Sequence, residues 1–132
     1  MKELRIAAKT ENLPVVLGFV NKSLQERGCP MKLQTRIAIA VEEVFVNIAH
    51  YAYNLGEGEA VLRLSDVGDV VIEFEDSGVP YNPLLRQDPD ITAGAEERQV
   101  GGLGIYMVKN IMDTVEYRYE GGKNILTLCK KI

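Results

Sequence analysis

The segment Val41-Glu42-Glu43-Val44-Phe45-Val46-Asn47 places two polar side chains, Glu43 and Asn47, among apolar ones. Residues four apart lie on one face of an α-helix, one turn from each other. A carboxylate and an amide among apolar neighbours are costly to bury unless something uses them. We therefore treat Glu43 and Asn47 as candidate functional residues. The alternative is a solvated acid beside an amide, which is common on helices.

The helix that carries this pair is expected to run from about residue 32 to residue 53. Upstream, alternating polarity over residues 3–8 predicts a strand. Between this strand and the 32–53 helix, a shorter helical pattern ends near Gly28. Thr10 is expected to cap this shorter helix, with Pro14 in its first turn. Along the 32–53 helix, apolar residues recur at spacings of three and four, which is typical of a face that packs against a core: Leu33, Ile37, Val41, Val44 and Ile48.

Downstream, strands are expected at 60–64 and 70–74, and a hairpin over residues 114–129 turns at Gly121-Gly122. A long polar loop and a short helix that begins near Gly101 lie between them. The order β-α-α-β-β-loop-α-β-β predicts an α/β (α+β) two-layer sandwich. In this fold a mixed, mainly antiparallel sheet is covered on one face by three helices. The 132 residues are expected to form a single domain.

A second candidate site is Asp76-Ser77-Gly78, where a strand runs into a glycine turn. An Asp at this position can accept a hydrogen bond from an amino group in a pocket, and Gly78 lets a flat ligand approach the backbone. The alternative is an ordinary Asp-Ser-Gly turn, in which the Asp side chain bonds its own backbone.

A third candidate site is Gly101-Gly102-Leu103-Gly104, at the expected start of a helix. Free backbone amides and the positive end of the helix dipole favour anions there, and glycines admit a phosphate without steric clash. The stretch is neither a Walker A nor a Rossmann motif, because it lacks Gly-Lys-Ser/Thr and has a different spacing. The alternative is a flexible hinge. The polar loop before it is typical of a binding loop or lid.

The composition narrows the class of function. Fifteen basic and nineteen acidic residues give a net charge of −4, which disfavours direct nucleic-acid binding, because such binding relies on neutralising phosphates. No apolar run reaches the roughly 18 residues of a membrane span, and no signal-peptide pattern is present, so we expect a cytoplasmic protein with no membrane association. Two cysteines, Cys29 and Cys129, do not form a disulfide framework and are expected to be buried or half-buried.

Taken in order, a helical Glu-x-x-x-Asn, a strand-end Asp-x-Gly and a Gly-x-Gly before a helix resemble the nucleotide site of the GHKL (histidine-kinase-like) ATPase superfamily. Within it, the chain resembles the bacterial anti-sigma factor serine kinases. The resemblance covers nearly the whole chain, through residues 41–47, Ala52-Tyr53, 76–78 and 101–105. These motifs indicate the fold and ATP binding. They say less about the reaction, because every GHKL branch shares them.

The resemblance implies a role for each site residue. Asn47 would bind Mg²⁺ and bridge it to the triphosphate, and Asp76 would accept the adenine amino group, which favours ATP over GTP. Gly78 would let the base lie close to the backbone. Glu43 would be the general base toward a serine hydroxyl, a role that suits a carboxylate. Under an ATP lid at about residues 82–100, the phosphates would contact Gly101, Gly102, Leu103 and Gly104, with Arg98 as a further candidate.

This sequence departs from the family pattern at three places. Tyr51 occupies the position where several members have His, so we interpret His50 as a neutral or packing residue. Relatives have a Gly-Thr or Thr-Thr pair near the adenine on the last strand, where this chain has Gly122-Lys123-Asn124; Asn124 is a candidate substitute. Arg98 lies two residues further from the phosphate glycines than the Arg of some relatives.

The resemblance implies an ATP- and Mg²⁺-dependent protein serine kinase. Such a kinase would phosphorylate a small anti-anti-sigma (STAS-type) protein and would sequester a sigma factor. A homodimer is also implied, with Leu4 and Ile6 of the first strand as candidate contacts. The alternative is a nucleotide-binding regulatory module that switches partners without transferring phosphate. Simple ATP hydrolysis is less favoured, because other GHKL ATPases complete their site with a further segment.

Overall fold

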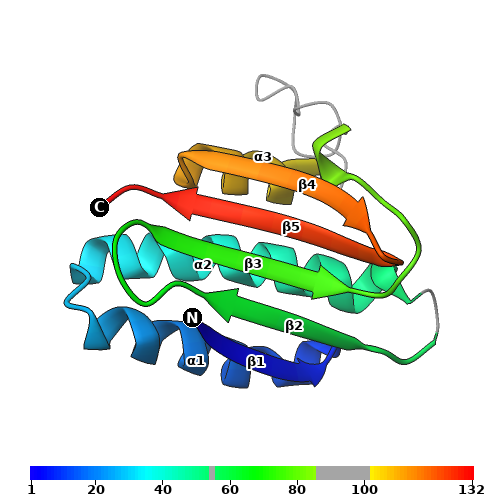
Figure 1. The fold of residues 1–132 in the computed structure, drawn as a ribbon, viewed down its shortest axis with the longest axis horizontal. Helices are drawn as coiled ribbons and strands as arrows, with labels where there is room; N and C mark the ends of the chain where they lie inside the picture. The colour runs from blue at the N-terminus through cyan, green and yellow to red at the C-terminus, as the bar shows by residue number, and fades with distance from the viewer. Residues whose placement is uncertain (54–55, 86–101) are drawn as a thin grey trace.

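The computed structural model describes residues 1–53, 56–85 and 102–132 (Figure 1). Its elements follow the expected order. The helices and strands are β1 (Lys2–Ala7), α1 (Leu13–Glu26), α2 (Met31–Asn47), β2 (Glu59–Leu64), β3 (Val70–Asp76), α3 (Gly102–Ile111), β4 (Thr114–Glu120) and β5 (Lys123–Lys130). Short 3-10 turns occur at Thr10–Asn12 and Pro83–Leu85, and a π-helical turn at Ile48–Ala52 continues α2.

The five strands form one sheet in the order β1-β2-β3-β5-β4. Every pair of neighbours among them is antiparallel, so the expectation of a mixed sheet is wrong in that detail. For two of the four pairs the reason is local: β2 with β3 and β4 with β5 are hairpins, and a hairpin pairs its strands antiparallel. Gly121 and Gly122 both have positive φ at the β4–β5 turn, the backbone that tight hairpin turns require.

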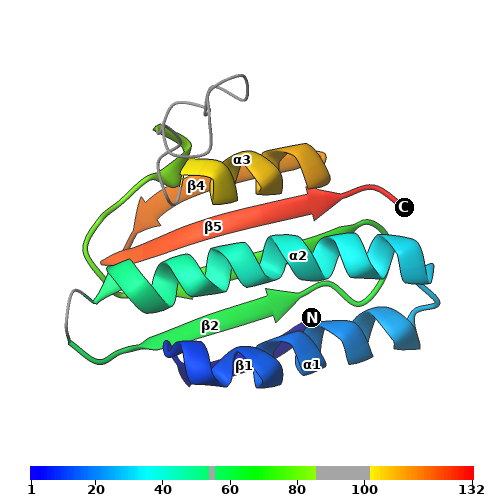
Figure 2. The same ribbon diagram turned by 180° about the vertical axis from the view of Figure 1, so that it is seen from behind.

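All three helices cover the same face of the sheet, as the two opposite views show (Figures 1 and 2). Strand side chains alternate between the two faces, so every second residue of a strand enters the core. The stripe predicted for α2 is buried at Ile37, Val41, Val44 and Ile48. It packs with Val16, Val20 and Leu24 of α1, Leu62, Phe74 and Leu128 of the sheet, and Ile105 and Val108 of α3.

The start of α1 differs from the expected cap. Thr10 begins a 3-10 turn, and α1 begins only at Leu13, with Pro14 in its first turn. The side-chain amide of Asn12 donates a 2.9 Å hydrogen bond to the carbonyl of Ala7, which ties the turn to β1. The predicted cap at Thr10 is therefore wrong, because the three-residue 3-10 turn Thr10–Asn12 comes before the helix and Asn12 takes the capping position.

Other predictions about β1 and the cysteines concern burial. Leu4 and Ile6 are half-buried and pack against the core of the same chain. Cys29 is buried and Cys129 is half-buried, as expected.

In the described part of the chain, no helix has both the length and the apolar character needed to cross a bilayer.

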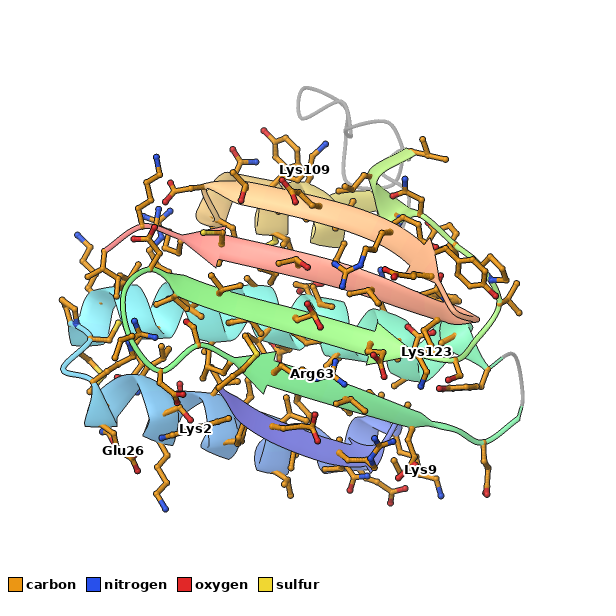
Figure 3. All side chains as sticks on the ribbon, viewed as in Figure 1. Lys2, Lys9, Glu26, Arg63, Lys109 and Lys123 are labelled. Carbon is orange, nitrogen blue, oxygen red and sulfur yellow. The ribbon has the colours of Figure 1, made fainter. Side chains whose placement is uncertain are left out.

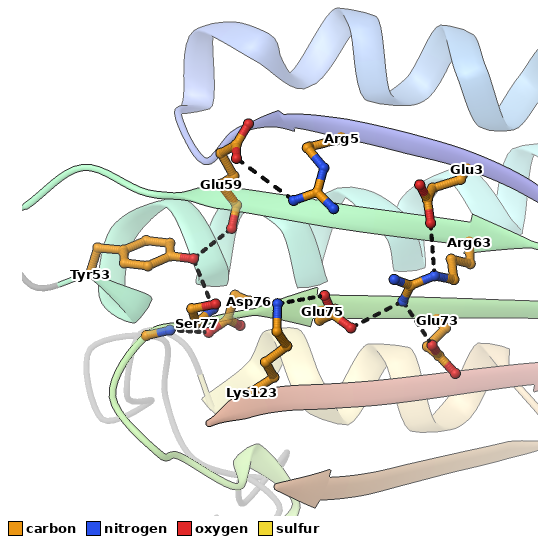
Figure 4. A network of polar contacts seen from close by, with 11 residues as sticks. Glu3, Arg5, Tyr53, Glu59, Arg63, Glu73, Glu75, Asp76, Ser77 and Lys123 are labelled. Atoms are coloured by element: carbon orange, nitrogen blue, oxygen red, sulfur yellow. Dashed lines mark hydrogen bonds and ion pairs between the residues drawn. The ribbon is translucent and has the colours of Figure 1, made fainter. Parts of the chain in front are cut away.

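The uncovered face of the sheet carries charged side chains (Figure 3). Arg63 of β2 is at its centre, with side-chain contacts to Glu3 at 3.0 Å, Glu73 at 3.1 Å and Glu75 at 3.2 Å (Figure 4). Lys123 of β5 contacts the second oxygen of Glu75 at 3.3 Å. These ion pairs join β1, β2, β3 and β5 immediately beside the end of β3, where Asp76 lies.

Candidate functional site

A cavity of about 390 Å³ lies on the helix-covered side of the sheet, near the end of β3. This volume falls within the range of roughly 300–1,000 Å³ that is typical of small-molecule sites. Most of the wall is apolar, with Val44, Ile48, Phe74, Ile105 and Leu126 among the lining side chains. The polar residues of the wall include Glu43, Asn47, Asp76, Tyr117 and Asn124. The cavity therefore brings together residues from α2, α3, β3, β4 and β5.

Asp76 is a buried acid in this wall, with 7% of its surface exposed. It follows Phe74 by two residues along β3 and so faces the same side of the sheet. Its Oδ1 accepts hydrogen bonds from the backbone N–H of Gly78 and from Nδ2 of Asn124, both at 2.9 Å. Within the described residues Oδ2 accepts none, so one carboxylate oxygen is available to a ligand.

The contact from Asp76 to Gly78 shows that the ordinary Asp turn is present as well. Asp76 bonds its own backbone two residues on, as the alternative interpretation expected, and it also lines the cavity. The two interpretations are compatible, because the turn uses only one of the two carboxylate oxygens.

Gly78 has a structural role of its own. A Cβ atom at this position would lie 2.0 Å from the carbonyl oxygen of Ala52, a distance that no side chain tolerates. The backbone N–H of Val79 donates to that same carbonyl at 2.9 Å. Glycine is thus required by the close packing of this loop on the π-helical turn that follows α2. The contact of Gly78 with an adenine base remains a prediction.

Tyr53 fastens the same loop to the sheet (Figure 4). Its hydroxyl accepts a hydrogen bond from the backbone N–H of Ser77 at 2.9 Å and donates one to the carbonyl of Glu59 at 2.6 Å. The loop that directly follows Asp76 is therefore attached both to the end of α2 and to β2.

Glu43 and Asn47 both line the cavity from one face of α2, as their spacing predicts. Burial raises the pKa of the Glu43 carboxyl, and the neighbouring charge of Glu42 raises it further. A carboxylate with a raised pKa is a stronger proton acceptor than an ordinary one. A Cβ atom at Gly104 would come within 2.6 Å of Oε2 of Glu43, so the first turn of α3 lies against this acid.

The predicted phosphate segment is described only in part. Gly102, Leu103 and Gly104 form the first turn of α3, as expected. Arg98, Gly101 and the greater part of the predicted lid at residues 82–100 lie outside the described residues. Of that lid, residues 82–85 are described, and the 3-10 turn Pro83–Leu85 falls there.

His50 is exposed, and its ring meets that of Tyr51 edge-on, with 5.9 Å between the ring centroids. Tyr51 lines the cavity. The two rings meet at the surface, so the interpretation of His50 as a neutral or packing residue stays a prediction.

Sequence reasoning missed Tyr117 and Tyr81, which also line the cavity. Tyr117 lies two residues after Val115 on β4, and that alternation places it on the core face of the strand. Tyr81 lies in the irregular segment after Gly78, where no periodic pattern indicates which way a side chain points.

The molecule is an α+β fold in which a helix pair and the end of a central strand surround a cavity of the size typical of small-molecule sites. The family described as the histidine kinase-like ATPase domain matches residues 6–130, and the chain belongs to this family.

Two curated relatives show the similarity in sequence. Serine/threonine-protein kinase BtrW of Bordetella bronchiseptica is 26% identical over 99 residues, which cover 74% of this chain and 70% of that protein. Serine-protein kinase RsbW of Bacillus mycoides is 25% identical over 129 residues, which cover 94% of this chain and 81% of that protein.

Two solved structures have the same fold. The RsbU and RsbW domains of Rv1364c from Mycobacterium tuberculosis align with a TM-score of 0.65 at 16% identity, over 99% of this chain and 32% of that one. The histidine kinase domain of the blue-light activated histidine kinase EL346 from Erythrobacter litoralis aligns with a TM-score of 0.54 at 17% identity, over 90% of this chain and 60% of that one. The chain thus spans about a third of the first of these chains and under two thirds of the second.

Proposed function

We propose that the chain binds ATP and Mg²⁺ in this cavity and is a protein serine kinase that acts on a small anti-anti-sigma (STAS-type) protein. From its resemblance to the bacterial anti-sigma factor serine kinases, we propose that it also sequesters a sigma factor. The observation that carries the proposal is the available Oδ2 of Asp76 in an otherwise largely apolar cavity, with Glu43 close to the first turn of α3.

The cavity suits an adenine base. Its apolar walls can cover the faces of a flat aromatic ring, and a buried carboxylate oxygen can accept a hydrogen bond from the exocyclic amino group. Guanine has a carbonyl oxygen in place of that amino group, and two acceptors cannot bond each other. Asp76 would therefore favour adenine nucleotides.

The residues of α2 and α3 suit the charged end of the nucleotide. Mg²⁺ prefers oxygen ligands and usually keeps several waters and phosphate oxygens around it. Asn47 would supply one amide oxygen to the metal. The first turn of α3, Gly102–Gly104, would supply free backbone N–H groups to the phosphates. ATP, when bound, provides the phosphoryl group that is transferred.

Glu43 would act on the protein substrate. A raised pKa would prepare it to accept the proton of a serine hydroxyl, and its contact with the first turn of α3 supports a position near the expected phosphates. Phosphoryl transfer depends first on positioning and charge neutralisation, so this proton transfer would be a late contribution.

The proposed protein partners are inferred from the similarity of this chain to its relatives. The relatives named serine-protein kinase support a protein substrate over free hydrolysis of ATP. An anti-anti-sigma protein, a sigma factor, a homodimer and a cytoplasmic location remain predictions.

The test is incubation of the full chain with Mg²⁺, γ-labelled ATP and candidate anti-anti-sigma proteins. Wild type should label one of them, and Glu43→Gln should reduce transfer by at least about a hundredfold while the affinity for ATP stays within a few-fold. Equal transfer by both proteins would remove Glu43 from this role. If wild type binds ATP but labels no partner, the chain is instead a regulatory module that switches partners.

The adenine site has a test of its own. Asp76→Asn should abolish ATP binding in calorimetry with little change in the melting temperature of the free protein. An unchanged affinity would contradict the assignment of Asp76. Asn47→Ala should weaken binding in the presence of Mg²⁺ more than in the presence of a chelator.

A further inference from the structure

Among the described residues of the candidate site, Asn124 has the side chain with the most hydrogen bonds. It lies on β5 directly opposite Asp76 of β3, and 7% of its surface is exposed. Its Nδ2 donates to Oδ1 of Asp76 at 2.9 Å and to the carbonyl of Val79 at 3.0 Å. Its Oδ1 accepts from the backbone N–H of Tyr81 at 3.0 Å and from the hydroxyl of Tyr117 at 2.5 Å.

These partners permit one orientation of the amide. An ionised carboxylate can only accept a hydrogen bond, so the NH₂ group must face Asp76. A backbone N–H can only donate, so the amide oxygen must face Tyr81. The oxygen and the nitrogen of the Asn124 amide cannot be told apart from the shape of the side chain. The hydrogen-bonding chemistry of the neighbours identifies which is which.

The orientation of Asn124 determines what Asp76 presents to the cavity. Oδ1 of Asp76 already accepts hydrogen bonds from Asn124 and from Gly78. These two donors hold the plane of the carboxylate and leave Oδ2 as the oxygen that meets a ligand. A loosened Asn124 would let the carboxylate turn away from the position that fits an amino group.

Tyr117 reaches this network from the neighbouring strand β4. Burial raises the pKa of its hydroxyl, although a backbone contact with Tyr81 acts in the opposite direction. A tyrosine hydroxyl is protonated at neutral pH even without this shift, and here it donates the 2.5 Å hydrogen bond to Oδ1 of Asn124. Since the amide oxygen must accept from Tyr117, the tyrosine helps to keep the NH₂ group on Asp76.

We propose that Tyr117 and Asn124 are positioning residues for Asp76, and that this pair sets the preference for adenine over purines that carry oxygen at position 6. The inference rests on the proposed nucleotide site and extends it to residues on β4 and β5. Neither residue needs to touch the base, because both act through the carboxylate.

The first test compares Tyr117→Phe with Tyr119→Phe. Both changes remove one hydroxyl from β4, but Tyr119 does not line the cavity and is exposed. Tyr117→Phe should weaken ATP binding about three- to tenfold, the effect of one hydrogen bond, and should leave ITP binding unchanged. Tyr119→Phe should leave both affinities unchanged. The ratio of the two affinities, measured by calorimetry, is a readout that general loosening of the fold would not move.

The second test is Asn124→Asp. Two carboxylates at this distance share a proton, and a protonated carboxyl can donate to a 6-oxo group. The preference for ATP over ITP should therefore fall as the pH is lowered in the variant, and it should not do so in wild type. If Asn124→Asp does not fold, as judged by thermal melting, Tyr117→Phe decides the question alone.

The outcomes separate this inference from the proposed function. If wild type prefers ATP and Asp76→Asn loses that preference, but Tyr117→Phe keeps the wild-type ratio, the positioning pair is wrong and the site stands. If wild type binds ATP and ITP equally, or Asp76→Asn binds ATP as well as wild type, the assignment of Asp76 to the adenine is overturned and the positioning pair with it. The labelling experiment then still tests the kinase by itself.

Discussion

Glu43 and Gly104 lie so close together that a Cβ atom at position 104 would come within 2.6 Å of Oε2 of the acid. The two residues are 61 positions apart and belong to different helices, α2 and α3. The contact joins two of the three sequence motifs, since Glu43 belongs to the helical pair and Gly104 to the glycine segment.

Gly104→Ala should impair phosphotransfer without unfolding the protein. The added methyl group meets the end of a flexible side chain, which can move, so the melting temperature should change little. The displaced Glu43 would lose its position, and phosphotransfer should fall at least about tenfold. Gly18→Ala is the matched control, because nothing lies within 4 Å of a Cβ there. Equal activity of Gly104→Ala and wild type would show that the position of Glu43 is unimportant.

Gly78→Ala should destabilise the fold itself. Here the added Cβ would lie 2.0 Å from a backbone oxygen, that of Ala52, which cannot yield as a side chain does. Overpacking of this kind reduces the free energy of unfolding by roughly 1–3 kcal/mol. Urea denaturation would measure the loss, with the exposed neighbour Ser77→Ala expected to stay within about 0.5 kcal/mol of wild type. An undiminished midpoint for Gly78→Ala would mean that the loop can leave the end of α2 freely.

Glu42→Gln should move the acid limb of the kinase pH profile to lower pH. Burial raises the pKa of Glu43 above the ordinary value of 4.5, and Glu42 raises it further. A base with a raised pKa gains its proton at a higher pH, so activity falls on acidification earlier than an ordinary Glu would allow. Removing the charge of Glu42 lowers that pKa. The measurement is kcat/KM against pH, with Glu11→Gln, an exposed acid on another element, as the control that should not shift the limb.

Arg63→Met should lower the free energy of unfolding at neutral pH. It should also make that free energy depend less on pH. Burial acts to raise the pKa of Glu75, but hydrogen bonds from Arg63 and Lys123 outweigh it and leave the pKa lowered. A carboxyl with a lowered folded pKa contributes stability above its ordinary value of 4.5 and loses it as the pH falls through the folded pKa.

At pH 7 the Arg63→Met variant should lose about 1.5–3 kcal/mol, the worth of hydrogen bonds to charged groups. The difference from wild type should shrink as the pH falls below 4.5. Arg5→Met is the comparison, because the Arg5–Glu59 pair is 3.8 Å long and exposed on both sides. Denaturant titrations of wild type and both variants at pH 7 and pH 4 would give six free energies of unfolding, and from them each variant's difference from wild type at each pH. A gap between Arg63→Met and wild type that does not narrow in acid would contradict this account.

The elements of the fold could be predicted because their signals are local. The spacing of Ile37, Val41, Val44 and Ile48 defines a helix face within one segment, and it is buried as expected. Thr10 shows the limit of such signals. A capping residue is recognised by type, but a 3-10 turn, tied to Ala7 through Asn12, occupies that position instead.

The site could be predicted in part. Glu43, Asn47 and Asp76 were found from spacing and motif order, and they line one cavity. The hydrogen bond between Tyr117 and Asn124 could not be found in this way. It depends on the register of β4 against β5, and the contact of Asn124 with Asp76 depends on the register of β5 against β3. Pairings between distant strands are set by the packing of the whole sheet.

The distance along the chain between Asp76 and Asn124 has a consequence for synthesis. The two are 48 positions apart, and β3 lies between β2, made before it, and β5, made after it. On a translating ribosome, β3 can pair on one side as soon as it emerges, but its other edge stays bare until β5 has been added. During that interval Asp76 lacks its amide donor. A growing polypeptide therefore acquires the arrangement that would hold a nucleotide only late in translation.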